Sequence, residues 1–429
     1  MRNAVLVAVL CLPLGLRGQP QSPLSIDLAD ALKRAREYNP LFLAAGVATS
    51  LAREDKVQAR AALLPTVEAV NGVLYTQGNA TDTGVFVANN GVHVYDEQAA
   101  VHAEVFSFGK QAEYRRAIAA EAAARARQDV AQRGLAATVI TSYYGLVTAQ
   151  RHLVNARRSL DEARNFEDIT RKQEQGGEAA RADVVKAQFT RTQRERELSE
   201  AQTNVEKATL AVAVLIFADL NQPFRVVDDL KPDTPVAAPP EIRQEAVASS
   251  PDIRAAQSSV DQAAFGIKAA RAGYLPTFSI DYFYGIDAHQ WAVRDPEGHR
   301  NLGNVVQATV TVPVWNWGST RSKVRQAELQ RQQAQLDLRF AQRQIDANTS
   351  AFYLEAQAAR AQIQSLRGSA DLAEESLRLT LLRYQAGEAT ALEVVDSQST
   401  VADARNAYDD GLARYRLAQG NIEILTGRY

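Results

Sequence analysis

The sequence predicts a mixed fold that is mainly α, in which very long helices are joined to a few strands and the whole unit occurs twice. Three observations predict it. Gln175–Ala179 (QGGEA) returns as Gln385–Ala389 (QAGEA), an offset of 210 residues (385 − 175) in a chain of 429. Long stretches without proline carry apolar residues at a helical period, and two stretches in each copy alternate apolar and polar residues, as strands do. Repetition over half the chain indicates a tandem duplication.

Residues 1–18 have the pattern of a secretory signal peptide, with Arg2 as the positive start, a short apolar segment over 4–16, and Gly18 near a plausible cleavage point. Cys11 is the only cysteine, and Leu10 before it fits a lipoprotein cleavage site poorly. We therefore expect the mature chain to leave the cytoplasm without a thiol, so neither disulfides nor cysteine metal sites are available to it.

Prolines mark the boundaries of the two copies. The first structural repeat is expected over 24–220 and the second over 241–429, separated by a linker over 221–240 that holds five prolines. Each repeat opens with two short helices. Pro40 and Pro251 separate these helices, because proline disfavours a helical conformation in the residue before it.

A β-hairpin follows in each copy, over 66–108 and 277–316. The alternation is clearest in the second copy, where Phe278, Ile280 and Tyr282 are interleaved with Ser279 and Asp281. Each strand has about the nine to eleven residues that a tilted strand needs to cross a hydrocarbon layer.

A long helical hairpin completes each copy, over 110–217 and 319–425. No proline interrupts Arg321 to Tyr384, and at 1.5 Å per residue an unbroken helix there would be roughly 95 Å long. One set of its residues, apolar except for Thr380, recurs in steps of four and three, the period of a left-handed coiled coil: Phe352, Ala356, Ala359, Ile363, Leu366, Ala370, Ala373, Leu377, Thr380 and Tyr384. Gly177 and Gly387 are expected to take the left-handed conformation that ends a helix.

Composition and motifs exclude several classes of function. The formal net charge of −2 gives no bias toward nucleic acid, and no apolar run after the N-terminus is long enough to span a bilayer as a helix. No nucleophile elbow, phosphate loop or zinc-binding helix occurs, so we expect neither an enzyme nor a cofactor. The histidines show no ligand spacing, so no metal site is expected: His93, His102, His152, His289 and His299.

Four strands cannot close into a membrane barrel, because the smallest barrels need about eight strands and an open edge in lipid leaves backbone groups unpaired. Several chains must therefore share one barrel. The helices that continue from those strands are too long for a compact domain, so the sequence predicts a membrane-anchored tube, which has the shape of a conduit.

Several short motifs resemble the TolC family of bacterial outer-membrane efflux proteins, over essentially the whole mature chain. They are Asn39-Pro40, the Leu-Pro starts of the first strands (Leu64-Pro65, Leu275-Pro276), the strand exits Phe106-Ser107-Phe108-Gly109 and Trp315-Asn316-Trp317-Gly318, the tip at 384–389 and the ending at 417–427. The resemblance implies a homotrimer in which four strands per chain contribute to a shared twelve-stranded transmembrane β-barrel over a periplasmic α-barrel of coiled-coil helices. It also implies location in the cell outer membrane, contact with its lipid, and work with an inner-membrane pump through a periplasmic adaptor (a membrane fusion protein).

The resemblance also implies roles for residues near the helical tips. Glu393 and Asp396 would repeat around a threefold axis as a ring of carboxylates at the periplasmic aperture; the alternative is two solvated acids at a helix start, which the helix dipole favours. Asp183 and Tyr384 resemble a family latch between helix pairs, although the latch's basic residue falls at Ala389; alternatively, Tyr384 ends the coiled-coil seam. The tip residues expected to contact the adaptor are Gly176, Gly177, Glu178, Ala386, Gly387 and Glu388.

The aromatic residues at the strand exits either form an interfacial belt that positions the barrel or pack in the core of the joint: Phe106, Phe108, Trp315 and Trp317.

Two functions from different classes remain open. The first is a passive outer-membrane channel of a tripartite efflux or type I secretion system, with small molecules as the favoured cargo. The second is a structural coiled-coil surface protein without a transport role. Strands with one polar face favour the channel, because a lumen needs Ser279, Asp281 and Gln307 to point into water.

Overall fold

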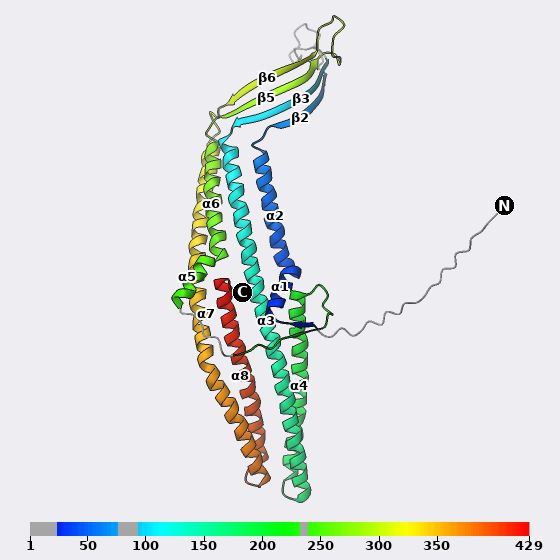
Figure 1. The fold of residues 1–429 in the computed structure, drawn as a ribbon, viewed down its shortest axis with the longest axis vertical. Coiled ribbons are helices and arrows are strands. Elements are labelled where there is room, and N and C mark those ends of the chain that lie inside the picture. The colour runs from blue at the N-terminus through cyan, green and yellow to red at the C-terminus, as the bar shows by residue number, and fades with distance from the viewer. Residues whose placement is uncertain (1–23, 76–92, 232–238, 429) are drawn as a thin grey trace, which may run out of the picture. The chain divides into compact units, whose positions relative to one another are not determined.

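The computed structural model describes residues 24–75, 93–231 and 239–428 (Figure 1). The expected signal peptide at 1–18 lies outside the described residues. So do 76–92 of the first hairpin loop and 232–238 of the expected linker.

Within the described residues, one order of elements occurs twice. The first copy contains α1 (Leu28–Tyr38), α2 (Pro40–Ala61), β2 (Thr66–Tyr75), β3 (His93–Phe106), α3 (Phe108–Gly176) and α4 (Arg181–Ile216). The second contains α5 (Pro239–Ser249), α6 (Pro251–Ala272), β5 (Thr277–Ala288), β6 (Leu302–Thr311), α7 (Ser319–Gln385) and α8 (Ala391–Thr426). Three pairs of corresponding helices have equal lengths: α1 and α5 have 11 residues, α2 and α6 have 22, and α4 and α8 have 36. The longest pair, α3 and α7, differs by two residues, 69 against 67.

Helix boundaries follow from local chemistry. Asn39 and Ser250 cap α2 and α6, each accepting backbone N–H bonds through its side chain, and a proline occupies the first position of both helices. Among the described helices, none combines the length and the apolar composition that crossing a membrane would require.

The chain divides into two compact units, of which the first comprises residues 1–38, 138–233 and 359–417. Here β1 (Leu24–Ile26) pairs in parallel with β4 (Phe224–Val226), which lies within the expected linker. Phe224 stacks on Phe217 with the ring centroids 5.3 Å apart. The fully buried Tyr143 donates a hydrogen bond to the Val227 carbonyl at 2.8 Å and accepts one from the Val227 N–H at 3.1 Å. These contacts hold the strand against α3.

The coiled-coil seam expected along α7 is confirmed by burial. All ten seam residues are buried or half-buried, and Ala356, Ala359 and Leu377 are among the fully buried ones. In the first unit, the C-terminal part of this seam, from Ala373 to Tyr384, packs in an apolar cluster with residues of α3, α4 and α8. The cluster consists of Phe166, Ala187, Ala373, Leu377, Tyr384, Ala391, Val394 and Val401. The four helices therefore share one core in this unit.

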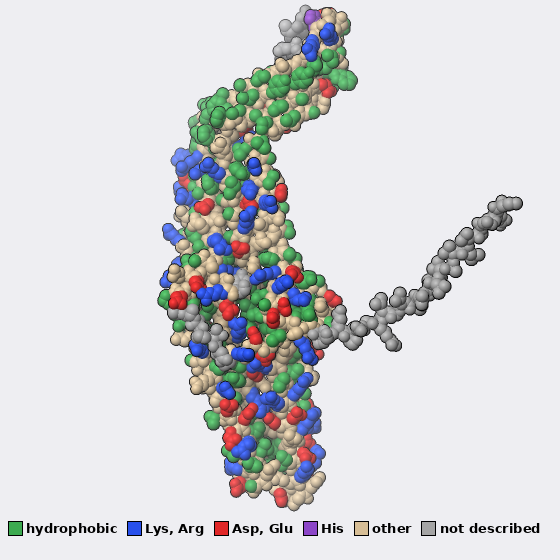
Figure 2. All heavy atoms as spheres, in the orientation of Figure 1, with side chains coloured by type: hydrophobic (Ala, Val, Ile, Leu, Met, Phe, Trp, Pro, Cys, Tyr) green, Lys and Arg blue, Asp and Glu red, His purple; other side chains and the backbone are tan. Residues whose placement is uncertain are grey.

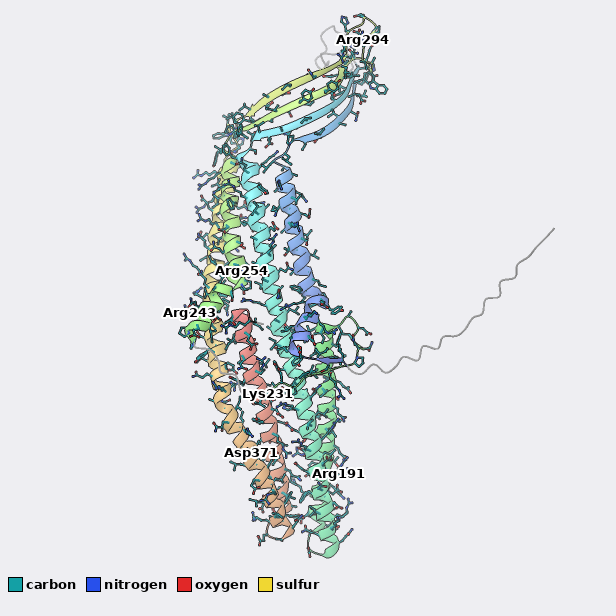
Figure 3. The ribbon with its side chains drawn as sticks, viewed as in Figure 1. Arg191, Lys231, Arg243, Arg254, Arg294 and Asp371 are labelled. Carbon is teal, nitrogen blue, oxygen red and sulfur yellow. The ribbon has the colours of Figure 1, made fainter. Side chains whose placement is uncertain are left out.

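The second unit comprises residues 39–137, 234–358 and 418–429, and holds a four-stranded antiparallel sheet of order β2-β3-β5-β6. Ion pairs join its helices, including Arg243 to Asp346 and Arg254 to Asp129, both at 2.8 Å. Figure 3 labels the two arginines, which lie on α5 and α6. Within the sheet, the hairpin of each copy is joined to the other through β3 and β5. Of the described strands, β2 and β6 form the two edges and each pairs with one neighbour.

Candidate functional site

The register of the sheet separates a polar face from an apolar one. Residues directly opposite each other on neighbouring strands point to the same face. Thr66, His102, Asp281 and Gln307 form one such row across all four strands, and Ser279 lies opposite Thr309. The expectation that Ser279, Asp281 and Gln307 share a face is confirmed.

The polar face is acidic. Five carboxylates lie on it, and within the described strands no lysine or arginine does: Glu68, Asp96, Glu104, Asp281 and Asp287. Two of these acids have cationic or ionisable partners, because the His102 Nδ1 lies 2.6 Å from Asp281 and Lys110, at the start of α3, lies 3.3 Å from Glu104. A pore lined by such a face would attract cations and repel anions.

The opposite face of the sheet is apolar and exposed in the protomer. Tyr282 lies opposite Val306 and Phe278 opposite Val310, and all four side chains are exposed. Figure 2 shows hydrophobic side chains gathered over the strands, whereas charged side chains cover the helices. The charged exception on this face is Glu97, opposite Ile286. A face of this kind fits hydrocarbon better than water.

Both helical tips end in the same backbone motif. Gly177 and Gly387 have φ values of +79° and +76°, as expected for the left-handed conformation. The N–H of Glu178 bonds the carbonyl of Gln173, and the N–H of Glu388 bonds that of Arg383, both at 2.8 Å. This is the Schellman arrangement that closes a helix C-terminus. All six expected tip residues are exposed in the protomer.

Tyr384 lies inside the first unit's core. Its hydroxyl donates to the Thr170 Oγ1 at 3.2 Å, and its ring meets that of Phe166 with centroids 5.2 Å apart. Burial raises the pKa of Tyr384, the hydrogen bond to Thr170 lowers it, and the nearby negative charge of Asp183 raises it further. Asp183 itself is half-buried in the first turn of α4.

Glu393 and Asp396 are both exposed on α8, but their surroundings differ. Glu393 and Thr390 form a capping box: the Thr390 N–H donates to the Glu393 carboxylate at 3.2 Å, and the Glu393 N–H donates to the Thr390 hydroxyl at 3.3 Å. Arg383 lies 3.6 Å from the same carboxylate. Hydrogen bonds from the Thr390 backbone and side chain lower the pKa of Glu393. Glu393 therefore stabilises the first turn of α8 as part of a capping box.

The four aromatic residues at the strand exits are exposed in the protomer. Phe106 contacts Phe278, and Trp315 contacts Trp317, with centroids 6.2 and 5.7 Å apart in edge-to-face geometry. Trp317 is 90% exposed and Phe108 is 55% exposed, so neither ring is covered by its own protomer.

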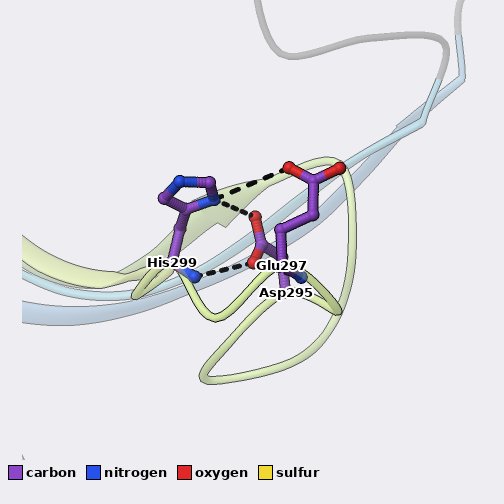
Figure 4. A group of neighbouring side chains, drawn as sticks. All are labelled: Asp295, Glu297 and His299. Atoms are coloured by element: carbon purple, nitrogen blue, oxygen red, sulfur yellow. Dashed lines mark hydrogen bonds and ion pairs between the residues drawn. The ribbon is translucent and has the colours of Figure 1, made fainter.

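Two features were missed from the sequence. The Thr390–Glu393 spacing is itself a capping-box signal. In addition, Asp295, Glu297 and His299 meet in the loop between β5 and β6 (Figure 4), where the His299 Nδ1 lies 2.9 Å from Asp295 Oδ2 and 3.7 Å from Glu297 Oε2. Burial raises the pKa of Asp295, but the hydrogen bonds from His299 outweigh this and the pKa lies below its usual value. The sequence did contain a signal for this cluster, because Asp295, Glu297 and His299 occur at every second position and Gly298 marks a turn among them.

Comparison with known proteins agrees with this architecture. The family described as "Outer membrane efflux protein" matches residues 31–216 and 242–428. The cobalt-zinc-cadmium resistance protein CzcC of Cupriavidus metallidurans is 26% identical over 297 residues, which is 68% of this chain and 67% of that protein. The outer membrane protein TolC of Vibrio cholerae is 23% identical over 396 residues, 91% of this chain and 87% of that protein.

The fold has close relatives among solved structures. A membrane protein from Pseudomonas aeruginosa superimposes with a TM-score of 0.83 at 20% sequence identity, covering 93% of each chain. The predicted fold class, the resemblance to the TolC family, the outer-membrane location and the absence of an enzymatic role are thereby confirmed. This chain belongs to the outer membrane efflux protein family and is an outer-membrane channel component of an efflux or secretion system.

Proposed function

We propose that three copies of this chain form a passive conduit from the periplasm to the exterior, in which twelve strands close one barrel. The observation that carries the proposal is the sheet itself. It has an apolar face, an acidic face, and two edge strands, β2 and β6, that each pair with one neighbour in the described residues. Unpaired strand edges are not tolerated in lipid, so β2 of one copy must pair with β6 of the next.

The two edges can be tested directly, because Cys11 in the expected signal peptide is the only cysteine of the chain. Cysteines at Val73 on β2 and Val306 on β6 should be joined between copies by a short bismaleimide, giving covalent dimers and trimers on denaturing gels. Each single-cysteine variant is the matched control and should give no ladder. If the double variant folds but gives no covalent dimers or trimers, the proposal that three chains share one barrel is wrong.

Small cationic solutes are the cargo that the acidic strand face favours. The described strands place five carboxylates and no lysine or arginine on this face, and only Glu104 has a lysine partner, Lys110 of α3, so the face would concentrate cations in a lumen. The similarity to a protein named for cobalt, zinc and cadmium resistance supports the same class of cargo. The test is export: cells lacking the channel should become sensitive to cationic compounds or metal ions and not to anionic ones of similar size. Loss of polypeptide secretion with unchanged sensitivity would assign the channel to protein secretion.

The helical tips are the proposed contact with a periplasmic adaptor, which would connect the channel to an inner-membrane pump. Gly176, Gly177 and Glu178 form one exposed turn and Ala386, Gly387 and Glu388 the other. A photo-crosslinking residue at Glu178 or Glu388 should capture the adaptor in cells, and the same residue at Glu68, on the strand face, should not. If the adaptor were captured from Glu68 alone, the strand end rather than the helical tips would face the adaptor, and the proposed orientation would be wrong.

The proposed aperture residues are Glu393, Asp396, Asp183 and Tyr384. The aromatic residues at the strand exits are proposed to form the interfacial belt. Asp396 is the better candidate for a charged ring, because the Glu393 carboxylate is already engaged by Thr390 and Arg383. The exposure of Phe106, Phe108, Trp315 and Trp317 supports a lipid-interface role over core packing within the protomer. Family membership leaves no support for the alternative of a structural surface protein.

A further inference from the structure

Three side chains of metal-ligating chemistry meet in the loop that joins β5 to β6. One ligand atom from each of Asp295, Glu297 and His299 lies within 4.8 Å of the other two. We propose that these residues form a binding site for a divalent transition-metal ion of the zinc and cobalt class, apart from the conduit and the aperture.

The backbone of the loop holds the three residues on one side of a tight turn. Arg294 and Arg300 form an isolated antiparallel bridge, and the N–H of Asp295 donates to the carbonyl of His299 at 3.0 Å. Gly298 takes φ +91°, a conformation that other residues rarely adopt, and its N–H closes the turn on the Asp295 carbonyl at 3.0 Å. The ligand positions 295, 297 and 299 therefore alternate along a fixed turn, and little ordering is needed on binding.

The spacing of the donor atoms fits a small metal ion. His299 Nδ1 lies 2.9 Å from Asp295 Oδ2 and 3.7 Å from Glu297 Oε2 (Figure 4). Ligands bound to zinc at about 2.0–2.2 Å lie roughly 3 to 4 Å from one another. The remaining pair of donors, from Asp295 and Glu297, lies within 4.8 Å, so a rotation of the exposed Glu297 side chain brings all three onto one ion without a change of the backbone.

The chemistry of the donors selects the class of ion. Two carboxylates give a charge of −2, which matches a divalent cation, and an imidazole nitrogen favours zinc, cobalt or nickel over calcium and magnesium. Three protein ligands leave at least one position for water. The two arginines of the bridge reduce the long-range attraction, so the affinity depends mainly on the ligands themselves.

Two of the ligands can be removed without disturbing the turn. The third, Asp295, holds the turn itself, because its Oδ1 accepts the backbone N–H groups of Glu297 and His299 at 3.0 and 2.7 Å. The His299 side chain is 74% exposed and that of Glu297 is 82% exposed, and the His299 ring contacts the carboxylates of Glu297 and Asp295. His299→Ala and Glu297→Gln should therefore leave the fold intact. His289→Ala is the matched control, since His289 is exposed and lies in the same loop. His102→Ala controls for the His102–Asp281 pair on the sheet.

The experiment titrates the detergent-solubilised full-length protein, purified without a polyhistidine tag, with zinc chloride by calorimetry. One ion should bind per chain, with calcium failing to compete. His299→Ala and Glu297→Gln should each weaken binding at least about tenfold, because loss of even an outer-shell partner costs 10–100-fold at metal sites. His289→Ala and His102→Ala should bind as the parent does.

Cobalt gives an independent readout, because visible absorption of bound Co²⁺ reports nitrogen and oxygen coordination. The bands should disappear in His299→Ala and persist in His102→Ala. Zinc binding that survives His299→Ala, disappears in His102→Ala, or is displaced equally by calcium would overturn the proposal.

Discussion

The Tyr384 hydroxyl donates a hydrogen bond of 3.2 Å to Thr170, which links the last turn of α7 to α3 in the core of the first unit. Thr170 in turn donates to the Phe166 carbonyl at 2.9 Å, so both hydroxyl groups are satisfied without a charged partner. The residue that resembles a family latch is therefore also a packed core residue. Substitution can separate the proposed latch role of Tyr384 from its packing role.

Tyr384→Phe removes the hydroxyl and keeps the ring, so it should lower stability by only about 1 kcal/mol. Tyr384→Ala also removes the ring and should cost about 3–5 kcal/mol, as large aromatic truncations in cores do. Thermal unfolding followed by helical circular dichroism gives both values, with Tyr408→Phe as control. If Tyr384 is a latch, single-channel conductance should rise in Tyr384→Phe; unchanged conductance with the expected small loss of stability would leave it as a core residue only.

Glu393 and Asp396 should respond differently to removal. Asp396→Ala should weaken cation preference and block by multivalent cations in planar bilayers without impairing trimer formation, because the carboxylate ring would be reduced. Glu393→Ala should chiefly loosen the start of α8, because it breaks the capping box with Thr390. Equal selectivity of the parent and Asp396→Ala would show that Asp396 is a solvated acid only.

The sign of the pH effect at Glu393 follows from its lowered pKa. A carboxylate whose folded pKa lies below the ordinary value of 4.5 adds stability above that value and loses it as the pH falls through the folded pKa. The protection of the amides in the first turn of α8, measured as their exchange rates relative to those of an unstructured peptide at the same pH, should therefore fall below pH 4.5 in the parent. Glu393→Gln should show no such acid-dependent step.

The two faces of β5 can be compared with neighbouring residues. Ile280→Lys places a charge on the apolar face, where lysine at mid-membrane costs roughly 2–4 kcal/mol. Ser279→Lys places the same charge on the polar face, opposite Thr309. We expect Ile280→Lys to reduce the yield of assembled protein in outer-membrane fractions and Ser279→Lys to leave it near normal. Equal yields would mean that the faces have been assigned wrongly.

The acidic strand face should set ion preference independently of the helical tips. Asp281→Asn combined with Glu68→Gln should shift the reversal potential toward zero in a salt gradient, because both carboxylates lie on the polar face. Glu97→Gln is the matched control, since Glu97 lies on the opposite face. A shift in Glu97→Gln as large as that in the double variant would contradict an acidic lumen.

Alkaline pH should destabilise the contact between α3 and β4. Burial, reinforced by the negative charge of Asp229, raises the pKa of Tyr143 from 10.0 to about 12. A raised pKa adds stability below pH 10 that is lost as the pH climbs through about 12, a total of roughly 3 kcal/mol. The urea midpoint should fall between pH 9 and pH 11.5 in the parent and fall less in Tyr143→Phe.

Much of the fold could be predicted from the sequence because its signals are local. The spacing of four and three along α7 predicts which of its residues are buried. The ten seam residues from Phe352 to Tyr384 are indeed all buried or half-buried. The alternation in β5 assigns its faces, and Gly177 and Gly387 mark the tips through a conformation that glycine adopts freely. Each of these patterns depends only on neighbours within one or two helical turns or strand pairs.

The contacts between residues far apart in sequence are determined only by the tertiary structure. Pairing of β3 with β5 brings His102 to Asp281, 179 residues further along the chain, and thereby completes the row from Thr66 to Gln307. Pairing with β1, beside the hydrogen bonds of Tyr143 to Val227, gives Phe224–Val226 a strand conformation that this short sequence after Pro223 does not predict. The turn at Gly298 likewise gathers Asp295, Glu297 and His299, because side-chain proximity depends on backbone angles that composition and spacing leave open.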